Sequence, residues 1–144
     1  MKVERRTHIA VPPRVLYDVV MDPQRLEEWV TIHHNLEQAP PSPLRKGSTL
    51  TQCLKLAGKK FKVHWKVVEN DPCEYVVWEG RGPVASHARV EYRFNADDGG
   101  TDFSYLNEYD LPGGPLGRMA GRAVARVTQK ELEGSLRRLK EIVE

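Results

Sequence analysis

The sequence predicts an α+β domain in which a curved antiparallel sheet lies against a long C-terminal helix. Residues 60–67 alternate charged or histidine side chains with large apolar ones, which is typical of a half-buried antiparallel strand. Further segments with a period of two are separated by proline and glycine turns. No proline follows Pro115, and the final stretch is rich in helix formers. The expected order is one strand, two helices, six strands and one helix (β-α-α-β6-α).

The N-terminal third predicts one strand, two short helices and a second strand. Residues 2–11 are rich in strand formers and end at two prolines, which stop a strand and can begin a helix. Apolar residues recur at helical spacing over 15–20. Asp22 and the proline after it predict an N-cap and first turn for a second short helix. A strand near 33–37 follows, and a loop with several prolines comes next.

The central segment predicts a β-hairpin. The alternation of 60–67 places Phe61, Val63, Trp65 and Val67 on one face. A two-residue turn at Gly58 and Lys59 would place the even residues of 50–56 on that same face. The expected pairs are Leu56 with Phe61, Leu54 with Val63 and Gln52 with Trp65.

The remainder predicts three more strands and the closing helix. The strands are expected over 74–81, 88–94 and 101–111, separated by turns rich in glycine, proline and aspartate. The helix from 116 onward carries an apolar stripe on one side and arginine and lysine on the other. No internal repeat or linker divides the chain, so we expect a single domain over 1–144.

This order resembles the START/Bet v 1-like superfamily, within it the polyketide cyclase/dehydrase-like branch often labelled SRPBCC. The resemblance covers essentially the whole chain and rests on residues 23–29 (PQRLEEW), 82–84 (GPV), 111–122 (LPGGPLGRMAGR) and 135–139 (SLRRL). It implies the helix-grip (Bet v 1-like) fold and a START/SRPBCC-like ligand-binding domain, with a cavity between the concave sheet face and the last helix. Members commonly bind lipids, sterols or polyketides. A minority are enzymes, whose catalytic residues vary too much to carry over.

Composition excludes several classes of protein. No window approaches the roughly 18 apolar residues that a membrane-spanning helix needs, so no integral membrane association is expected. The charged N-terminus does not resemble a secretory signal, which predicts a cytoplasmic location. A net charge of +2 is too close to neutrality to indicate a nucleic-acid partner. Cys53 and Cys73 have no metal or redox spacing and are expected to be free thiols.

The expected cavity combines apolar residues with a few hydrogen-bonding groups, as small-molecule recognition requires. In the alternative interpretation, the tyrosine hydroxyls are solvated at strand ends, and Gln52 and Asn107 bond to each other or to water. The candidate ligand-binding residues are Trp29, His33, Gln52, Leu54, Val63, Trp65, Val90, Tyr92, Phe103, Tyr105, Asn107, Met119 and Ala123.

Catalytic and metal-binding patterns are weak. At most one of His33 and His34 points inward, because adjacent strand residues face opposite sides, and neither has an identifiable acid partner. Glu79 and Glu108 do not form a convincing acid/base pair, since burial of both is not predicted. Histidines and cysteines are not spaced to converge on an ion, so no metal site and no cofactor are expected. Catalytic residues therefore stay unassigned.

Three functions remain open. The first is binding or carriage of a hydrophobic or amphipathic small molecule. The second is a polyketide cyclase/dehydrase-type enzyme, in which Tyr105, Asn107 or His33 would orient the ligand. The third is a protein-interaction module using the basic face of the last helix, including Arg122 and Arg126. The sequence leaves the ligand's identity open, and it does not distinguish a monomer from a homodimer.

Overall fold

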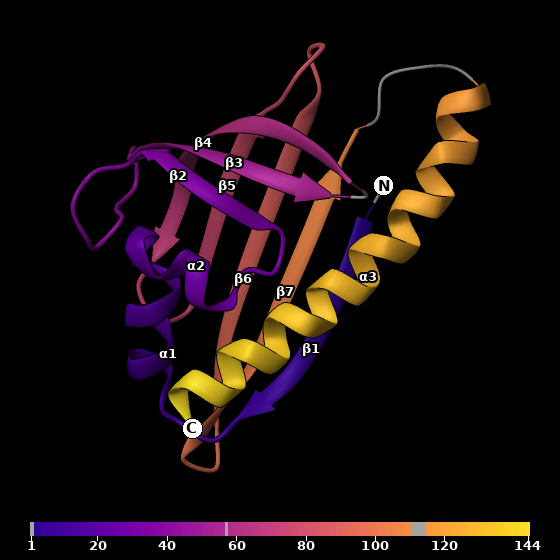
Figure 1. Cartoon of the computed structure of the whole chain (residues 1–144). Coiled ribbons are helices and arrows are strands. Elements are labelled where there is room, and N and C mark those ends of the chain that lie inside the picture. The colour runs from indigo at the N-terminus through magenta and orange to yellow at the C-terminus, as the bar shows by residue number, and fades with distance from the viewer. Residues whose placement is uncertain (1, 57, 111–114) are drawn as a thin grey trace.

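The protein is described from a computed structural model, which covers residues 2–56, 58–110 and 115–144, with side chains except at 115–121 (Figure 1). In these ranges, seven strands form one antiparallel sheet in the order β1-β7-β6-β5-β4-β3-β2. The elements are β1 (Lys2–Ile9), α1 (Pro13–Val20), the 3-10 turn η1 (Pro23–Arg25), α2 (Leu26–Trp29), β2 (His33–Gln38), β3 (Thr49–Leu56), β4 (Lys59–Asp71), β5 (Tyr75–Arg81), β6 (His87–Asp97), β7 (Gly100–Tyr109) and α3 (Pro115–Val143). The predicted α+β helix-grip fold and element order are confirmed.

Pro13 and Asp22 occupy the helix-start positions that the sequence predicts. Pro13 occupies the first turn of α1, where its missing N–H leaves no bond unmade. The Asp22 side chain accepts a hydrogen bond from the backbone N–H of Gln24 at 3.0 Å, which caps η1. The second helix is split into this 3-10 turn and a single α-helical turn, a division that apolar spacing does not reveal.

The β3–β4 hairpin has the predicted faces but a different register. Leu56 pairs with Lys59, Gln52 with Val63 and Leu50 with Trp65. The predicted register was therefore wrong by two residues, because the turn precedes Lys59 and Gly58 takes the positive φ of 79°. A shift of two preserves the side-chain parity, so Gln52, Leu54, Val63 and Trp65 still share the concave face.

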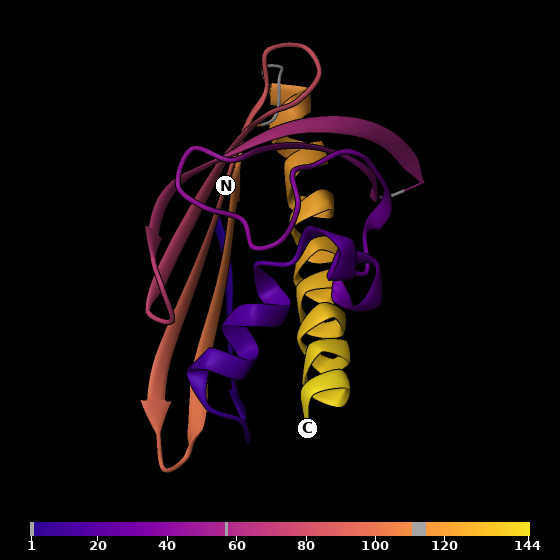
Figure 2. The same cartoon turned by 90° about the vertical axis from the view of Figure 1, so that its left-hand side faces the viewer.

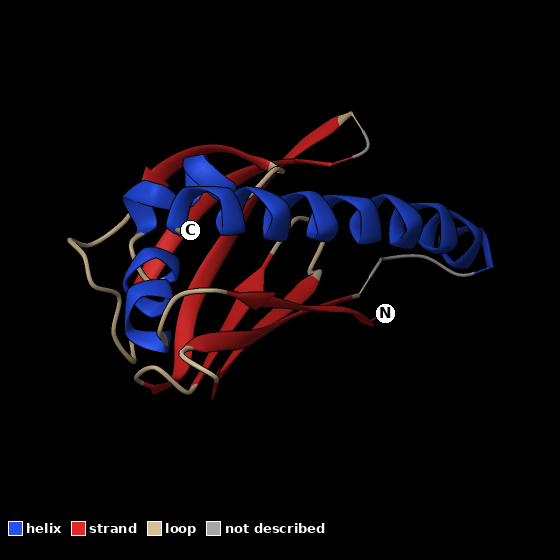
Figure 3. Cartoon of the chain, turned by 90° about the horizontal axis from the view of Figure 1, so that it is seen from below, coloured by secondary structure: helices blue, strands red, loops and turns tan. Residues whose placement is uncertain are grey.

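Sheet and helix form two layers. Figure 2 shows β2, β3 and β4 curling over one end of the gap between the sheet and α3. Figure 3 shows α3 crossing the open side of the sheet, with α1 and α2 beside its C-terminal end. No helix in the described ranges is both long and apolar enough to cross a membrane.

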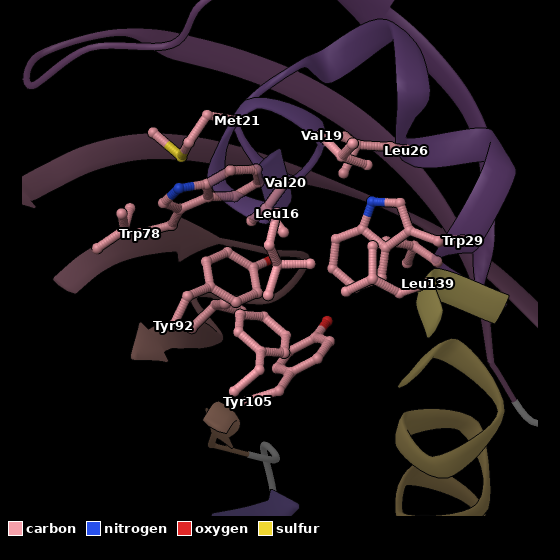
Figure 4. Packing of buried hydrophobic residues seen from close by; sticks show 14 of the residues in the cluster. Leu16, Val19, Val20, Met21, Leu26, Trp29, Trp78, Tyr92, Tyr105 and Leu139 are labelled. Atoms are coloured by element: carbon pink, nitrogen blue, oxygen red, sulfur yellow. The ribbon is translucent and has the colours of Figure 1, made fainter. Parts of the chain in front are cut away.

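The gap is filled at one end. Leu132, Leu136 and Leu139 of α3 are buried against the short helices and the sheet. Figure 4 shows Leu139 beside Trp29, with the aromatic rings of Tyr92 and Tyr105 opposite. The C-terminal half of α3 thus belongs to a closed apolar core.

A polar anchor fixes α3 at the boundary of this packed region. The backbone N–H of Thr31 donates to Ser135 Oγ at 3.0 Å. The Thr31 hydroxyl donates to the backbone carbonyl of Glu131 at 3.1 Å and also contacts the Glu131 carboxylate. A Cβ added at Gly134 would lie 3.3 Å from Thr31 Cγ2, so the small residue permits this close approach. The anchor sets which side of α3 faces the sheet.

Candidate functional site: a cavity between the sheet and α3

A cavity of about 460 Å³ lies between the concave sheet face and the part of α3 that precedes the anchor. Its walls come from every central strand, from α2 and its exit, and, among the α3 residues whose side chains are described, from Val124 and Thr128. The lining residues are Leu26, Val30, Ile32, Gln52, Leu54, Leu56, Lys59, Phe61, Val63, Trp65, Trp78, Gly82, Pro83, Val84, Ser86, His87, Ala88, Val90, Tyr92, Tyr105, Asn107, Tyr109, Asp110, Val124 and Thr128. The set is predominantly apolar, as in small-molecule sites.

Aromatic rings form the inner wall. Trp78 lies between Trp65 and Tyr92, with ring centroids 6.0 and 5.7 Å away in edge-on contacts. Tyr92 is 5.1 Å from Tyr105, and Tyr105 also meets the ring of Trp29 at 5.8 Å. Edge-on packing of rings gives a rigid wall, because each ring blocks the rotation of its neighbours.

Gln52 carries a hydrogen-bonded chain within this wall. The Trp65 indole N–H donates to Gln52 Oε1 at 3.0 Å. Gln52 Nε2 lies 2.8 Å from Nδ1 of His33, which is half-buried on β2. Gln52 is therefore held between an indole and an imidazole, and the alternative pairing of Gln52 with Asn107 is not the one that the structure has.

Burial keeps the interior uncharged. It raises the pKa of Tyr105 to about 12, and burial together with the neighbouring Tyr105 hydroxyl raises the pKa of Tyr92 well above its usual value. Both phenols are therefore protonated near neutrality. Burial also lowers the pKa of His33, which favours the neutral imidazole. The described side chains of the interior can orient a polar ligand atom, and none of them carries a fixed charge there.

The opening of the cavity is more polar than its interior. Lys59 from the hairpin and Asp110 after β7 bring opposite charges to the rim, and the exposed His87 also borders the cavity. Val84 in the β5–β6 connection is 79% exposed and has a φ of 55°, which is unusual for a β-branched residue. An apolar interior behind a polar rim is suited to an amphipathic molecule.

The predicted site residues separate into groups. The lining includes Gln52, Leu54, Val63, Trp65, Val90, Tyr92, Tyr105 and Asn107. Trp29 and Phe103 share the concave side but are fully buried in the packed core, and His33 lies behind Gln52 rather than in the lining. Ala123 is exposed and outside the lining, while Met119 lies outside the residues whose side chains are described.

The α3 contribution comes from residues that the sequence did not single out. Val124 and Thr128 line the cavity, and the Thr128 hydroxyl lies 3.1 Å from the Tyr109 hydroxyl. Residues 124 and 128 are one helical turn apart and lead directly to the buried Leu132. Extending that spacing backward from Leu132 is the signal that would have identified them.

One group of metal-capable side chains lies elsewhere in the described ranges. His8, Asp97 and Asp102 approach one another near the β6–β7 turn, with His8 Nδ1 3.1 Å from an Asp102 oxygen. All three are exposed, and none lines the cavity. This cluster is a surface contact at the β6–β7 turn, separate from the cavity.

Comparison with known proteins places this chain in a family. An uncharacterized protein of Mycobacterium tuberculosis is 28% identical over 135 residues, covering 91% of this chain and 93% of that protein. A crystal structure of a Thermus thermophilus protein superposes with a TM-score of 0.84 at 20% identity, covering 99% of this chain and 97% of that one. An aromatase/cyclase from a Streptomyces species gives 0.82 at 13% identity, covering 99% and 93%, and both likenesses establish the fold. The family model described as polyketide cyclase/dehydrase and lipid transport matches residues 1–144, and the chain belongs to that family.

Proposed function

We propose that the protein binds and carries a hydrophobic or amphipathic small molecule in the cavity between the sheet and α3. The observation that carries the proposal is the cavity itself, about 460 Å³ with a mainly apolar lining. Small-molecule sites typically span about 300–1,000 Å³. Apolar burial would supply most of the affinity, at roughly 25 cal/mol for each Å² removed from water.

The rim supports an amphipathic rather than a purely apolar ligand. Lys59, His87 and Asp110 surround the mouth, whereas the inner wall is built from neutral rings and aliphatic side chains. A charged or strongly polar end would remain at this rim in contact with water. The apolar body would occupy the space under Val124 and Thr128.

Filling the cavity tests the proposal. Ala88 on β6 lines the cavity, and Ala96 on the same strand is exposed outside it. Ala88→Trp should weaken binding of 1-anilinonaphthalene-8-sulfonate by about tenfold or more, a loss of at least about 1.4 kcal/mol. Ala96→Trp is the matched control and should bind as the unchanged protein does. Equal saturable binding to both variants would refute the cavity as the binding site.

A second candidate is an enzyme of the polyketide cyclase/dehydrase type. Its support is the placement of Tyr105 and Asn107 in the lining, where a protonated phenol and an amide can hold a ligand carbonyl. Turnover of a linear polyketide thioester analogue should then fall in Tyr105→Phe and in Asn107→Leu. Unchanged turnover in both variants would leave binding as the function.

A further inference from the structure

Gln52 is a buried amide whose orientation is determined by its neighbours. It is 4% exposed and forms part of the cavity wall. An indole nitrogen can only donate, so the Trp65 N–H at 3.0 Å must face the amide oxygen. The amide nitrogen therefore occupies the opposite side, toward His33.

This orientation fixes the state of His33. An amide nitrogen can only donate, so His33 Nδ1 at 2.8 Å must be the acceptor. The imidazole is then neutral, with its proton on Nε2. Its burial lowers its pKa, which supports the neutral form, while nearby Glu27 acts in the opposite direction and His34 in the same one.

The Gln52 side chain has more hydrogen-bonding positions than its described protein partners fill. A carboxamide has two N–H donors and two acceptor positions on its oxygen, and Trp65 and His33 occupy one of each. Among the described residues, neither the second N–H nor the second acceptor position of Gln52 has a protein partner. Gln52 Oε1 and Nε2 each have one protein partner, and a ligand oxygen that accepts the second N–H would add a further hydrogen bond in a buried setting.

We infer that Gln52 is a polar recognition point inside the cavity. The ligand carries a carbonyl or hydroxyl oxygen on an apolar body, and that oxygen accepts the second N–H of Gln52. His33 is a positioning residue, because its Nδ1 accepts one N–H of Gln52 and so holds the amide, while His33 itself is not part of the cavity lining. This inference rests on the proposed binding function of the cavity and names the class of ligand.

Two probes of nearly the same shape isolate the hydrogen bond. In 2-acetylnaphthalene a ketone oxygen takes the place of the methylene group of 2-isopropenylnaphthalene. Equilibrium dialysis gives a Kd for each, and the ratio of the two Kd values cancels their shared apolar contacts. We expect this ratio to shift about fivefold against the ketone when Gln52 becomes Met, in line with one neutral hydrogen bond.

Further variants separate recognition from folding. Gln52→Glu keeps an acceptor for Trp65 but removes both N–H groups, so it should lose the ketone preference without leaving the indole unpaired. His33→Leu should also lose the preference, whereas His33→Asn retains a side-chain acceptor and should restore it. Gln38 is exposed on the same strand as His33, so Gln38→Met is the matched control and should preserve the ratio.

The outcomes distinguish the two proposals. A ratio unchanged in Gln52→Met and Gln52→Glu, with both probes still bound in the cavity, overturns the recognition role and leaves the binding function intact. Failure of the folded, unmodified protein to bind either probe overturns both. A loss of preference in His33→Leu that His33→Asn restores supports the orientation of Gln52 through His33.

Discussion

Replacing Gly80 with alanine should displace Val63, Trp65 or both from their positions in the cavity wall. Gly80 on β5 lies directly opposite Trp65 on β4. A Cβ at this position would stand 2.6 Å from Val63 Cγ1 and 2.7 Å from Trp65 Cε3. Real Cβ contacts are longer, so one or both of these buried side chains must move. The indole would then move away from Gln52 Oε1, to which it donates at 3.0 Å.

The expected cost combines two effects. Forcing an extra methyl group into a packed region typically costs about 1–3 kcal/mol. Loss of the Trp65–Gln52 hydrogen bond adds about 1 kcal/mol. The free energy of unfolding of Gly80→Ala should therefore fall by about 2–4 kcal/mol. For a chain of this size that corresponds to a decrease in Tm of roughly 6–12 °C.

Urea unfolding followed by tryptophan fluorescence measures this change. A double-mutant cycle supplies the control, because Val63→Ala removes one of the clashing atoms. Gly80→Ala should cost about 1 kcal/mol less in the Val63→Ala background than in the unmodified protein. If Gly80→Ala lowers the free energy of unfolding by less than about 0.5 kcal/mol, the reasoning from close approach is refuted.

Three further predictions concern the anchor and the titratable groups. Ser135→Ala removes the acceptor of the Thr31 N–H and should lower the free energy of unfolding by about 1 kcal/mol in urea titration. The pKa of His33 is lowered by burial, so the unfolded chain binds more protons, and stability should fall as pH drops below about 6.5; His33→Asn should remove this component. The pKa of Tyr105 is raised to about 12, so stability should fall as pH rises from about 10 to 12; absorbance at 295 nm and a flatter profile in Tyr105→Phe check this. If stability depends on pH in His33→Asn or in Tyr105→Phe as it does in the unmodified protein, the pKa shift attributed to that residue is contradicted.

The sequence predicts sheet faces more reliably than strand register. Alternation along β4 depends only on parity, and Val63 and Trp65 lie on the predicted concave face for that reason. Register depends on which residue adopts a positive φ in the turn. The predicted turn begins at Gly58, whereas Leu56 pairs with Lys59 and moves every pair by two residues. The site survived this error because a shift of two changes no face.

The rotation of α3 about its own axis was harder to predict, because a tertiary contact determines which side of the helix faces the sheet. Leu132 and Leu136 of α3 are buried, but the predicted site residue Ala123 is exposed and its neighbour Val124 lines the cavity instead. The hydrogen bonds that fix this rotation join Thr31 to α3 across about 100 positions of sequence. Hydrophobic periodicity contains no information about such a partner. Trp29 and Phe103 show a related effect, since facing inward does not distinguish a core residue from a cavity residue.

The contrast between the packed and hollow ends of α3 follows from side-chain size on both layers. At the packed end, leucines of α3 meet Trp29 and the short helices. At the hollow end, the described side chains of α3 that line the cavity are Val124 and Thr128, while Gly82 directly follows β5 and Ala88 lies near the start of β6. Short side chains on both sides of a gap leave a volume that neither layer can fill, and the rigid aromatic wall prevents collapse into it. The cavity is therefore determined by small residues at one end of the fold, and Ala88 is the position at which adding side-chain volume should close it.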